Sequence, residues 1–473
     1  MSSRRKTKIL ATIGPASDTP QMVERLILAG ADGFRLNFSH GNHDYFRPLV
    51  ETIRVASAKT GKPIAILQDL QGPKIRTGTL ADGKSVHLIP GSRFILTSRQ
   101  LDGNAMIVST SYSGLPNDVK QGDRILLDDG ALELRVLQVN DPEIETEVVI
   151  GGILNEKQGI NLPGVNISAP SVTAKDESDA QFGQELSVDY VALSFVRSAA
   201  DVQKLRERLG ASDSRLIAKI EKAEAVKNLS EILEVSDGVM VARGDLGVEL
   251  PPERIPLLQK MIIEQANRSE KLVITATEML ESMVDHARPT RAEASDVANA
   301  ILDGTDVLML SQETAAGLYP EKTIQTMASI GEYTESDEEV FRNTDRIRPQ
   351  HLVNFTHAIV HSARRAAEVM KVKAIIVFTQ SGYTAELLSC QRPPCTIFAF
   401  TPNRRSLQVL ALVWGVCPIL MENLPDPNLM VQRAEKILLE KGFVAKGDPV
   451  VIVSGTQPAR GATNMMKMGR IGV

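Results

Sequence analysis

The sequence predicts an α/β protein: a parallel (β/α)8 barrel, with a small all-β lid domain inserted in it and a second α/β domain after it. Eight short apolar runs lie between Lys8 and Ser311, each followed by a helical segment. Parallel barrel strands are buried on both faces, which favours such runs. The alternation of apolar runs with helical segments stops once, from Gly72 to about Asn166. A further α/β segment begins after residue 350.

The apolar runs are the expected strands of this TIM barrel. They are Lys8–Ile13, Gly33–Phe38, Pro63–Leu70, Tyr190–Val196, Leu216–Ile220, Gly238–Ala242, Leu272–Ala276 and Val307–Leu310. The expected helices include one that begins at Asp18 or Thr19 and ends near Gly30, one over Lys175–Leu186, one capped near Thr290 and one after Pro320. Barrels of this kind carry their chemistry at the carboxyl ends of the strands.

The insertion is expected to be all-β because its apolar residues alternate and Asp-Gly turn signals separate the stretches. Those stretches are Ser85–Ile89, Arg93–Leu96, Ile125–Leu127 and Leu132–Val139. A charged, weakly periodic segment at 331–350 then separates the barrel from the last domain. That domain is predicted to hold a helix over Asn354–Met370 and strands near Ala374–Phe378, Thr396–Phe400, Val416–Leu420 and Val450–Val453.

These observations place the domain boundaries. The barrel is expected over 1–72 and 167–340, the lid over 73–166, and a regulatory and oligomerisation domain over 341–473. Three domains suit 473 residues at roughly 150 residues each.

Composition excludes several classes of function. Hydrophobic residues make up 43% and charged residues 23%, and the net charge is only -5, so neither nucleic acid nor a membrane is an expected partner. Three unevenly spaced cysteines predict reduced thiols rather than disulfides. No apolar stretch of about 7–15 residues follows the basic N-terminus, as a signal peptide would need. The expected location is the cytoplasm.

The strand tips carry the chemistry. Lys219 and Glu221 are two residues apart, so both should face the barrel mouth, and Asp245 is expected at the end of the next strand. Two carboxylates suit a hard cation such as Mg²⁺, and a lysine beside it suits a phosphoryl group in transfer. The alternative is a structural salt bridge at the barrel rim.

Two further clusters favour anionic substrates. Arg35, Asn37 and Ser39 alternate along one strand and should share a face, where the arginine fork suits phosphate. Lys74 and Arg76 follow a third strand at the point where the lid departs, and should face an anionic cleft. A strand end that caps a helix, and a solvated basic turn, are the respective alternatives.

One motif is misleading. The segment from Gly78 to Ser85 matches the P-loop pattern G-x-x-x-x-G-K-S, but a buried strand should precede such a loop and a helix should follow it. Helix breakers follow here, so a hairpin turn at residues 81–83 is predicted.

In the last domain, several hydroxyl side chains lie between a strand and a helix. They predict either an anion-binding site, with Arg460 as a further source of positive charge, or simple capping of the helix. The residues of this effector candidate are Thr379, Ser381, Gly382 and Thr384.

Together these motifs resemble the pyruvate kinase family, and the resemblance covers essentially the whole chain. The segments that carry it are Ala-Thr-Ile-Gly-Pro-Ala-Ser (11–17), Arg-Leu-Asn-Phe-Ser-His-Gly (35–41), Gln-Gly-Pro-Lys-Ile-Arg-Thr-Gly (71–78), Ala-Lys-Ile-Glu (218–221), Met-Val-Ala-Arg-Gly-Asp-Leu-Gly-Val-Glu (240–249), Ala-Thr-Glu-Met-Leu-Glu-Ser-Met (276–283), Arg-Pro-Thr-Arg-Ala-Glu (288–293) and Met-Leu-Ser-Gln-Glu-Thr-Ala (309–315).

The resemblance implies a glycolytic kinase that moves the phosphoryl group of phosphoenolpyruvate to ADP, giving pyruvate and ATP. It implies that Lys219 stabilises the moving phosphoryl, and that Glu221 and Asp245 hold Mg²⁺, with Mn²⁺ as the alternative ion. Thr277 would sit by the carbon that is protonated, with Ser311 on the proton route. The implied substrate-binding residues are Arg35, Lys219, Gly244, Asp245 and Thr277, and the implied nucleotide-binding residues are Asn37, His40, Arg76 and Lys157.

Departures from the family concern monovalent cations and the nucleotide. Many members hold K⁺ with residues that match Asn37, Ser39 and Asp69, together with a threonine where this chain has Leu70. The ammonium of Lys74 could supply that charge internally, so we expect no K⁺ requirement. The positions with altered nucleotide contacts are Glu278, Gln312 and Ala316.

Two other functions compete with this one. A Mg²⁺-dependent barrel lyase acting on an oxo-acid enolate would share the metal and the lysine but need no ADP. A sensor of phosphorylated metabolites would need neither, and the intact site weighs against it. The family also implies a homotetramer, with a dimer as the alternative, and an effector that is a sugar phosphate or a nucleotide.

Overall fold

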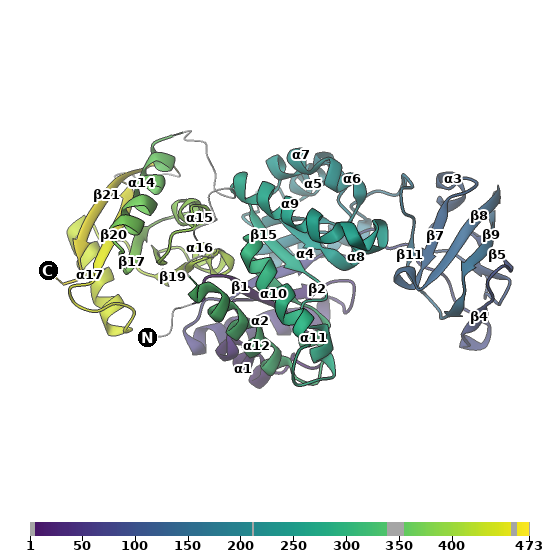
Figure 1. Ribbon diagram of the computed structural model, residues 1–473, viewed down its shortest axis with the longest axis horizontal. Coiled ribbons are helices and arrows are strands. Elements are labelled where there is room, and N and C mark those ends of the chain that lie inside the picture. Colours follow the sequence, from purple (N-terminus) through teal and green to yellow (C-terminus); the bar gives the residue numbers. More distant parts are fainter. Residues whose placement is uncertain (1–4, 211, 338–353, 456–460, 473) are drawn as a thin grey trace.

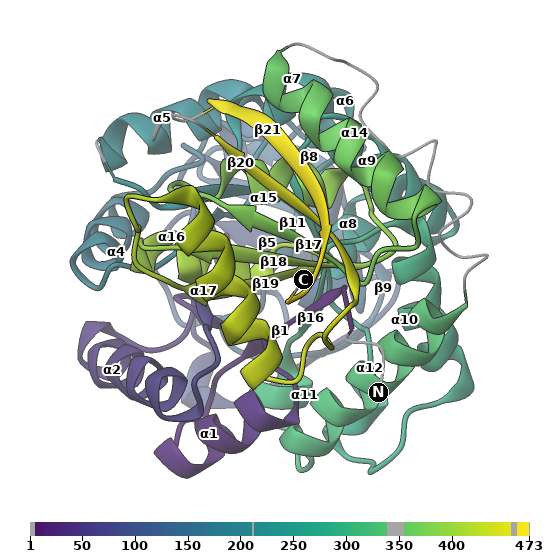
Figure 2. The same ribbon diagram turned by 90° about the vertical axis from the view of Figure 1, so that its left-hand side faces the viewer.

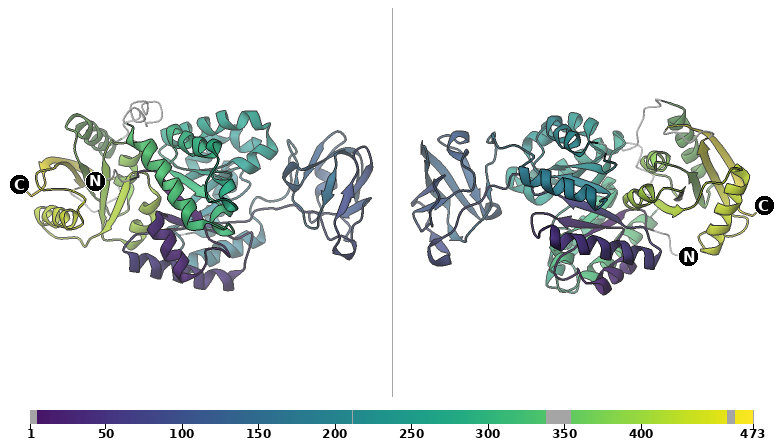
Figure 3. Two further views of the ribbon diagram at one scale, coloured as in Figure 1. Left: turned by 60° about the horizontal axis from the view of Figure 1, so that its bottom comes forward. Right: turned by 180° about the vertical axis from the view of Figure 1, so that it is seen from behind.

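The computed structural model describes residues 5–210, 212–337, 354–455 and 461–472. Three bodies lie in a row: the inserted β domain, the barrel and the C-terminal α/β domain (Figures 1 and 3). The two smaller bodies lie at opposite ends of the barrel. Asp245, which follows the carboxyl end of a barrel strand, lines a cleft with the inserted domain, whereas Arg215 at a strand start lines a cavity with the C-terminal domain.

The predicted barrel is confirmed as a closed, parallel eight-stranded sheet in the order β1-β16-β15-β14-β13-β12-β3-β2. Its strands are β1 (Lys8–Thr12), β2 (Gly33–Asn37), β3 (Ala65–Asp69), β12 (Tyr190–Leu193), β13 (Arg215–Ile220), β14 (Gly238–Ala242), β15 (Leu272–Ala276) and β16 (Val307–Leu310). Pairing of Lys8 with Val307 closes the ring. The fourth strand is shorter than expected, because Phe195 adopts a left-handed φ of 55° that ends the extended run.

Helices surround the barrel (Figure 2). The main ones are α1 (Pro20–Ala29), α2 (His43–Thr60), α4 (Ala174–Glu185), α5 (Ala199–Leu209), α9 (Ile255–Arg268), α10 (Arg291–Asp303) and α12 (Pro320–Ser336). The predicted caps are confirmed: the Thr19 hydroxyl accepts from Met22 N–H, and Thr290 and Glu293 form a reciprocal capping box. The charged segment expected over 331–350 is helical at its start, because α12 continues to Ser336.

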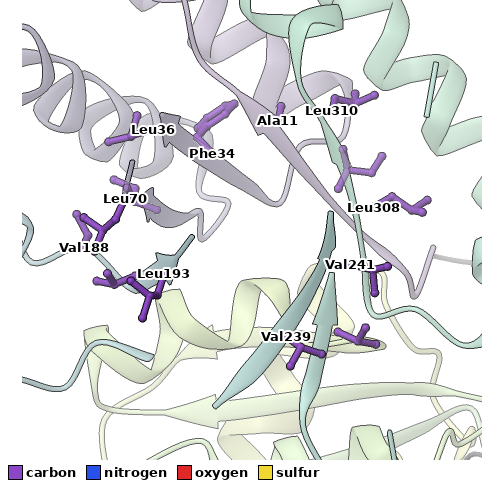
Figure 4. Close-up of a cluster of buried hydrophobic side chains, with 14 of the residues drawn as sticks. Ala11, Phe34, Leu36, Leu70, Val188, Leu193, Val239, Val241, Leu308 and Leu310 are labelled. Atoms are coloured by element: carbon purple, nitrogen blue, oxygen red, sulfur yellow. The ribbon is translucent and has the colours of Figure 1, made fainter. Parts of the chain in front are cut away.

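Apolar side chains fill both sides of the barrel wall. One core lies between strands and helices and contains Phe34, Leu36, Val239 and Leu308 (Figure 4). A second core includes alternate residues of the same strands, among them Leu10, Leu67, Ile217, Met240 and Ile274. Each fully buried side chain of this size contributes roughly 1.5–3 kcal/mol. The double packing fixes the strand register and therefore the positions of the strand tips.

The inserted domain has its own apolar core and is built of strands, as predicted. They are β4 (Val86–Leu88), β5 (Arg93–Thr97), β6 (Ile107–Ser109), β7 (Arg124–Leu127), β8 (Leu132–Asn140), β9 (Glu143–Ile150), β10 (Gly152–Leu154) and β11 (Ile160–Asn161), with one short helix, α3 (Leu115–Asp118). The P-loop match lies on a 3₁₀ turn at Ala81–Gly83 and β4 follows it, so it does not precede a helix. The predicted hairpin is wrong, because β4 pairs with β10.

The C-terminal domain is a five-stranded sheet in the order β19-β18-β17-β20-β21. Its elements are α14 (Phe355–Val369), β17 (Ala374–Phe378), α15 (Tyr383–Cys390), β18 (Thr396–Thr401), α16 (Arg404–Val409), β19 (Val416–Leu420), α17 (Pro427–Glu440), β20 (Pro449–Gly455) and β21 (Thr463–Arg470). The edge strand β21 was not predicted, because methionine, lysine, asparagine and glycine favour strands weakly. No helix in the described ranges is long and apolar enough to cross a bilayer.

Candidate functional site

Lys219 lies at the centre of the group of charges at the carboxyl end of the barrel. Its ammonium is 2.7 Å from Glu221 Oε1 and 3.4 Å from Asp69 Oδ1, and it donates to Ser194 Oγ at 2.9 Å. Lys219 and Glu221 therefore share a face, as the strand period predicted. The backbone N–H of Phe195 donates to the second oxygen of Glu221 at 2.7 Å, which fixes that carboxylate.

Burial and neighbouring charges have opposite effects on the pKa values of this group. Burial would lower the pKa of Lys219, but the charges of Asp69, Glu221 and Asp245 raise it above its usual value. Burial and then the charge of Asp245 raise the pKa of Glu221, although Lys219 opposes both. Burial is the largest cause of the raised pKa, so the cost of removing this carboxylate from water outweighs its stabilisation by Lys219.

Asp245 provides the unpaired carboxylate. It was predicted at a strand end, but it lies in the first turn of the short helix α8 (Arg243–Glu249), which begins directly after β14. Its side chain lines the cleft between barrel and inserted domain. Among the described residues it has no ion pair or side-chain hydrogen bond, so its oxygens are available to a ligand.

Arg35 is anchored by a neighbouring strand. Its guanidinium contacts Asp69 Oδ2 at 2.7 Å and donates to the Thr12 hydroxyl at 3.2 Å. Burial raises the pKa of Asp69, but Lys219 and Arg35 together lower it below its usual value. Asn37 Oδ1 accepts from the backbone N–H of Ser39. Asp69 therefore joins the two predicted cationic groups into one network.

Basic side chains at the base of the inserted domain face the same cleft. Lys74 and Arg76 line it with Asp245, in a volume of about 250 Å³. Desolvation in the cleft and the charge of Lys219 lower the pKa of Lys74. Partial burial, followed by the charges of Lys74, Arg76 and Arg35, lowers the pKa of His40. These groups form one positive field, which suits phosphates.

Lys157 belongs to the edge of the inserted domain. Its carbonyl accepts from Arg76 at 3.0 Å, while its side chain is exposed. Its backbone is left-handed, with φ of 57°. The structure therefore brings its backbone to the cleft, although Lys157 itself is not among the cleft-lining residues.

Thr277 and Ser311 end the two neighbouring strands β15 and β16. Thr277 and Glu278 are both left-handed, with φ of 69° and 53°, a conformation that costs of order 1–3 kcal/mol per residue. Thr277 Oγ1 donates to the Ala276 carbonyl at 2.6 Å and accepts from Gly244 N–H at 2.8 Å. Gly244 and Thr277, which were both predicted to bind substrate, are therefore in contact.

Sequence analysis missed several residues that hold this site. Ser194 contacts Lys219, and Arg243 donates to the Thr277 carbonyl at 2.6 Å. Glu313 is buried and accepts from two backbone N–H groups. Arg243 is adjacent to Gly244 in the chain, which was the available signal. Ser194 and Glu313 act through contacts that no local pattern reveals.

The effector candidate lies in the C-terminal domain, far from the barrel mouth (Figure 1). The Thr379 hydroxyl accepts from Gly382 N–H at 3.0 Å, and the Thr384 and Thr463 hydroxyls are 2.6 Å apart. Thr379, Ser381 and Thr384 line a cavity of about 1010 Å³. Arg460, which was expected to add charge there, lies outside the described residues.

A divalent ion fits the barrel site only with help from substrate. Within the described ranges no three His, Cys, Asp or Glu side chains form a metal-binding group. Glu221 and Asp245 supply two hard carboxylates, and Mg²⁺ commonly uses one or two protein carboxylates together with water and substrate oxygens. The chemistry of the donor set therefore fits Mg²⁺ shared with an anionic substrate.

Comparisons with known proteins agree with this geometry. The family models for the pyruvate kinase barrel domain and alpha/beta domain match residues 4–324 and 357–468. Pyruvate kinase from Sporosarcina psychrophila is 44% identical over 474 residues, covering 99% of this chain and 81% of that protein. Pyruvate kinase from Staphylococcus aureus strain USA300 is 44% identical over 476 residues, with the same coverage. A crystal structure of a Cryptosporidium parvum pyruvate kinase has a TM-score of 0.93 at 37% identity and covers 99% of this chain and 96% of that one.

Proposed function

Because this chain belongs to the pyruvate kinase family, it transfers the phosphoryl group of phosphoenolpyruvate to ADP and yields pyruvate and ATP, and we propose that this reaction takes place around Lys219. One observation carries the assignment: a buried ammonium lies between Glu221 and Asp69, beside the unpaired carboxylate of Asp245. Phosphoryl transfer depends on positioning and on neutralising charge, and this cluster supplies both.

Different residues act on the phosphoryl group and on the enolate. Lys219 lies where it neutralises the charge that develops on the phosphoryl oxygens. Arg35, held rigid by Asp69 and Thr12, binds the phosphate of phosphoenolpyruvate. Glu221 and Asp245 would hold Mg²⁺ or Mn²⁺, which neutralises substrate oxygens when bound. Thr277 and Ser311 lie along the side from which the methylene carbon gains its proton.

ADP is proposed to approach from the inserted domain. The positive charges of Lys74 and Arg76, which add to the effect of burial in lowering the pKa of His40, favour the nucleotide phosphates. Asn37 and Lys157 would complete this subsite from the barrel and the lid. Glu278, Gln312 and Ala316 are exposed at the barrel mouth, where a nucleotide can touch them.

Turnover of phosphoenolpyruvate tests the proposal against the lyase. Enzyme, phosphoenolpyruvate and Mg²⁺ are incubated with and without ADP, and pyruvate is measured with lactate dehydrogenase and NADH. Pyruvate that appears only with ADP, together with an equal amount of ATP, is the expected result. Product formed without ADP would support a lyase instead, and absence of product would support a sensor.

We predict that the enzyme does not need K⁺. The Lys74 ammonium faces Asp245 and Glu221, whose charges oppose the lowering of its pKa, so a fixed positive charge already occupies this side of the cleft. Replacing K⁺ by tetramethylammonium should change kcat by less than about twofold. In Lys74→Glu, activity without K⁺ should fall at least about tenfold and should recover when K⁺ is added. Strong K⁺ activation of the unmodified enzyme would contradict the prediction.

The proposal also covers regulation, assembly and location. The cavity beside Thr379 and Thr384 is large enough for a sugar phosphate or a nucleotide effector. A homotetramer is proposed from the family, with a dimer as the alternative. Separate apolar cores in the three bodies support the boundaries 1–72 with 167–340, 73–166 and 341–473. Cys390, Cys395 and Cys417 are not joined in disulfides, which supports the cytoplasm.

A further inference from the structure

Glu313 is a buried carboxylate that no step above uses. It lies in the short helix α11 (Gln312–Ala315), directly after Ser311, and only 1% of its surface is exposed. One oxygen accepts the backbone N–H of Ser311 at 2.6 Å, and the other accepts the backbone N–H of Leu280 at 3.2 Å. It therefore connects the loop after β16 to the loop after β15.

The loop after β15 is the strained one. Thr277 and Glu278 are left-handed there, and Arg243 holds the turn from the other side by donating to both of their carbonyls, at 2.6 and 3.2 Å. Such a conformation persists only where its surroundings fix it. A cation thus holds the carbonyls of this turn, and the Glu313 carboxylate accepts the N–H of Leu280, two residues after Glu278.

The Thr277 hydroxyl is already engaged at both ends. Its proton goes to the Ala276 carbonyl and its lone pair accepts from Gly244. In the proposed reaction a proton reaches the methylene carbon from this side of the barrel, where Thr277 and Ser311 provide two hydroxyls. Its arrival forms the C–H bond from the enolate π electrons, while the C–O bond becomes a carbonyl.

We infer that Glu313 is a positioning residue for this protonation: its carboxylate holds Thr277 and Ser311 in the register that delivers the proton to the methylene carbon. This inference rests on the function proposed above. Burial raises the pKa of the Glu313 carboxyl, and its bonds to the Ser311 and Leu280 N–H groups oppose that rise. Both oxygens act as acceptors, so an amide of the same shape cannot replace the carboxylate.

The test uses Glu313→Gln in the full-length enzyme and separates protonation from phosphoryl transfer. The exchange of pyruvate methyl protons with D₂O, in the presence of Mg²⁺ and ATP, reports the protonation step in reverse and is followed by NMR. We expect exchange and kcat to fall about 10- to 100-fold, the cost of a small misplacement of reacting groups. KM for phosphoenolpyruvate should change by less than about threefold. Glu313→Asp, which retains a carboxylate, should recover part of the exchange rate.

Glu335→Gln is the matched control. Glu335 is also a buried carboxylate that accepts two backbone N–H groups, those of Lys6 and Thr7, but at the opposite end of the barrel. It should lose thermal stability without losing exchange.

Two outcomes would overturn the inference: an exchange rate in Glu313→Gln equal to that of the unmodified enzyme, or equal losses of exchange in Glu313→Gln and Glu335→Gln. Should Glu313→Gln prove insoluble, a parental exchange rate in Glu313→Asp would overturn it instead. An unmodified enzyme that makes no pyruvate would refute the proposed function, whereas a deficit confined to Glu313 variants concerns this role alone.

Discussion

Replacing Lys219 with methionine is expected to lower kcat by about 10²- to 10³-fold, the usual cost of removing one donor that stabilises transition-state charge. The ammonium is the cation held between Glu221 and Asp69, at 2.7 and 3.4 Å. Methionine retains the volume but leaves the buried Glu221 carboxylate without its cation, while Asp69 keeps Arg35. Removing one partner of a buried pair destabilises a protein by roughly 3–5 kcal/mol. The coupled lactate dehydrogenase assay measures kcat, and thermal unfolding measures the loss of stability.

Two further variants separate chemistry from stability. Lys219→Arg keeps the charge but changes its shape, so it should unfold near the parental temperature and still lose most activity. Lys260→Met removes a lysine that pairs with Asp303 outside the site, and should keep its activity. A kcat within about threefold of the parent in Lys219→Met would exclude the proposed role of this ammonium.

Replacing Asp245 with asparagine is expected to act on the metal with little effect on the fold. The described residues give this carboxylate no ion pair, so its removal breaks no structural contact. The Mg²⁺ concentration for half-maximal activity should rise by at least about tenfold, and kcat should fall about 10²-fold, because one of two anionic ligands is lost. Titration of activity with Mg²⁺ at saturating phosphoenolpyruvate measures both quantities.

Asp296→Asn is the control for this substitution. Asp296 also lies near α8 and pairs with Arg243 at 2.6 Å, but it is not a proposed ligand. It should leave the Mg²⁺ requirement within about threefold of the parental value. An unchanged requirement in Asp245→Asn would remove Asp245 from the metal site.

The barrel could be predicted from the sequence because each of its strands is marked by a short, local stretch of residues. Strands buried on both faces need unbroken apolar runs, and the eight runs correspond to the eight strands of the closed sheet. The pairing of Lys219 with Glu221 followed from the two-residue period of a strand. Caps at Thr19 and Thr290 followed from residue type.

Other features depend on contacts between distant segments. Phe195 turns left-handed where its N–H donates to Glu221, so β12 ends earlier than its apolar run. Asp245 lies on a helix that begins without a side-chain cap, and therefore without a sequence signal. Glu313 connects two loops that are 33 residues apart in the chain. Such contacts become visible only when the strand tips are placed around the ring.

The central claim is that Glu221 and Asp245 share one divalent ion beside Lys219. Anomalous diffraction at the manganese edge, from crystals grown with Mn²⁺ and a non-reacting analogue of phosphoenolpyruvate, tests it most directly. We expect one strong peak within bonding distance of both carboxylates, with the Lys219 ammonium next to the analogue. A peak elsewhere, or one that contacts neither Glu221 nor Asp245, would contradict it.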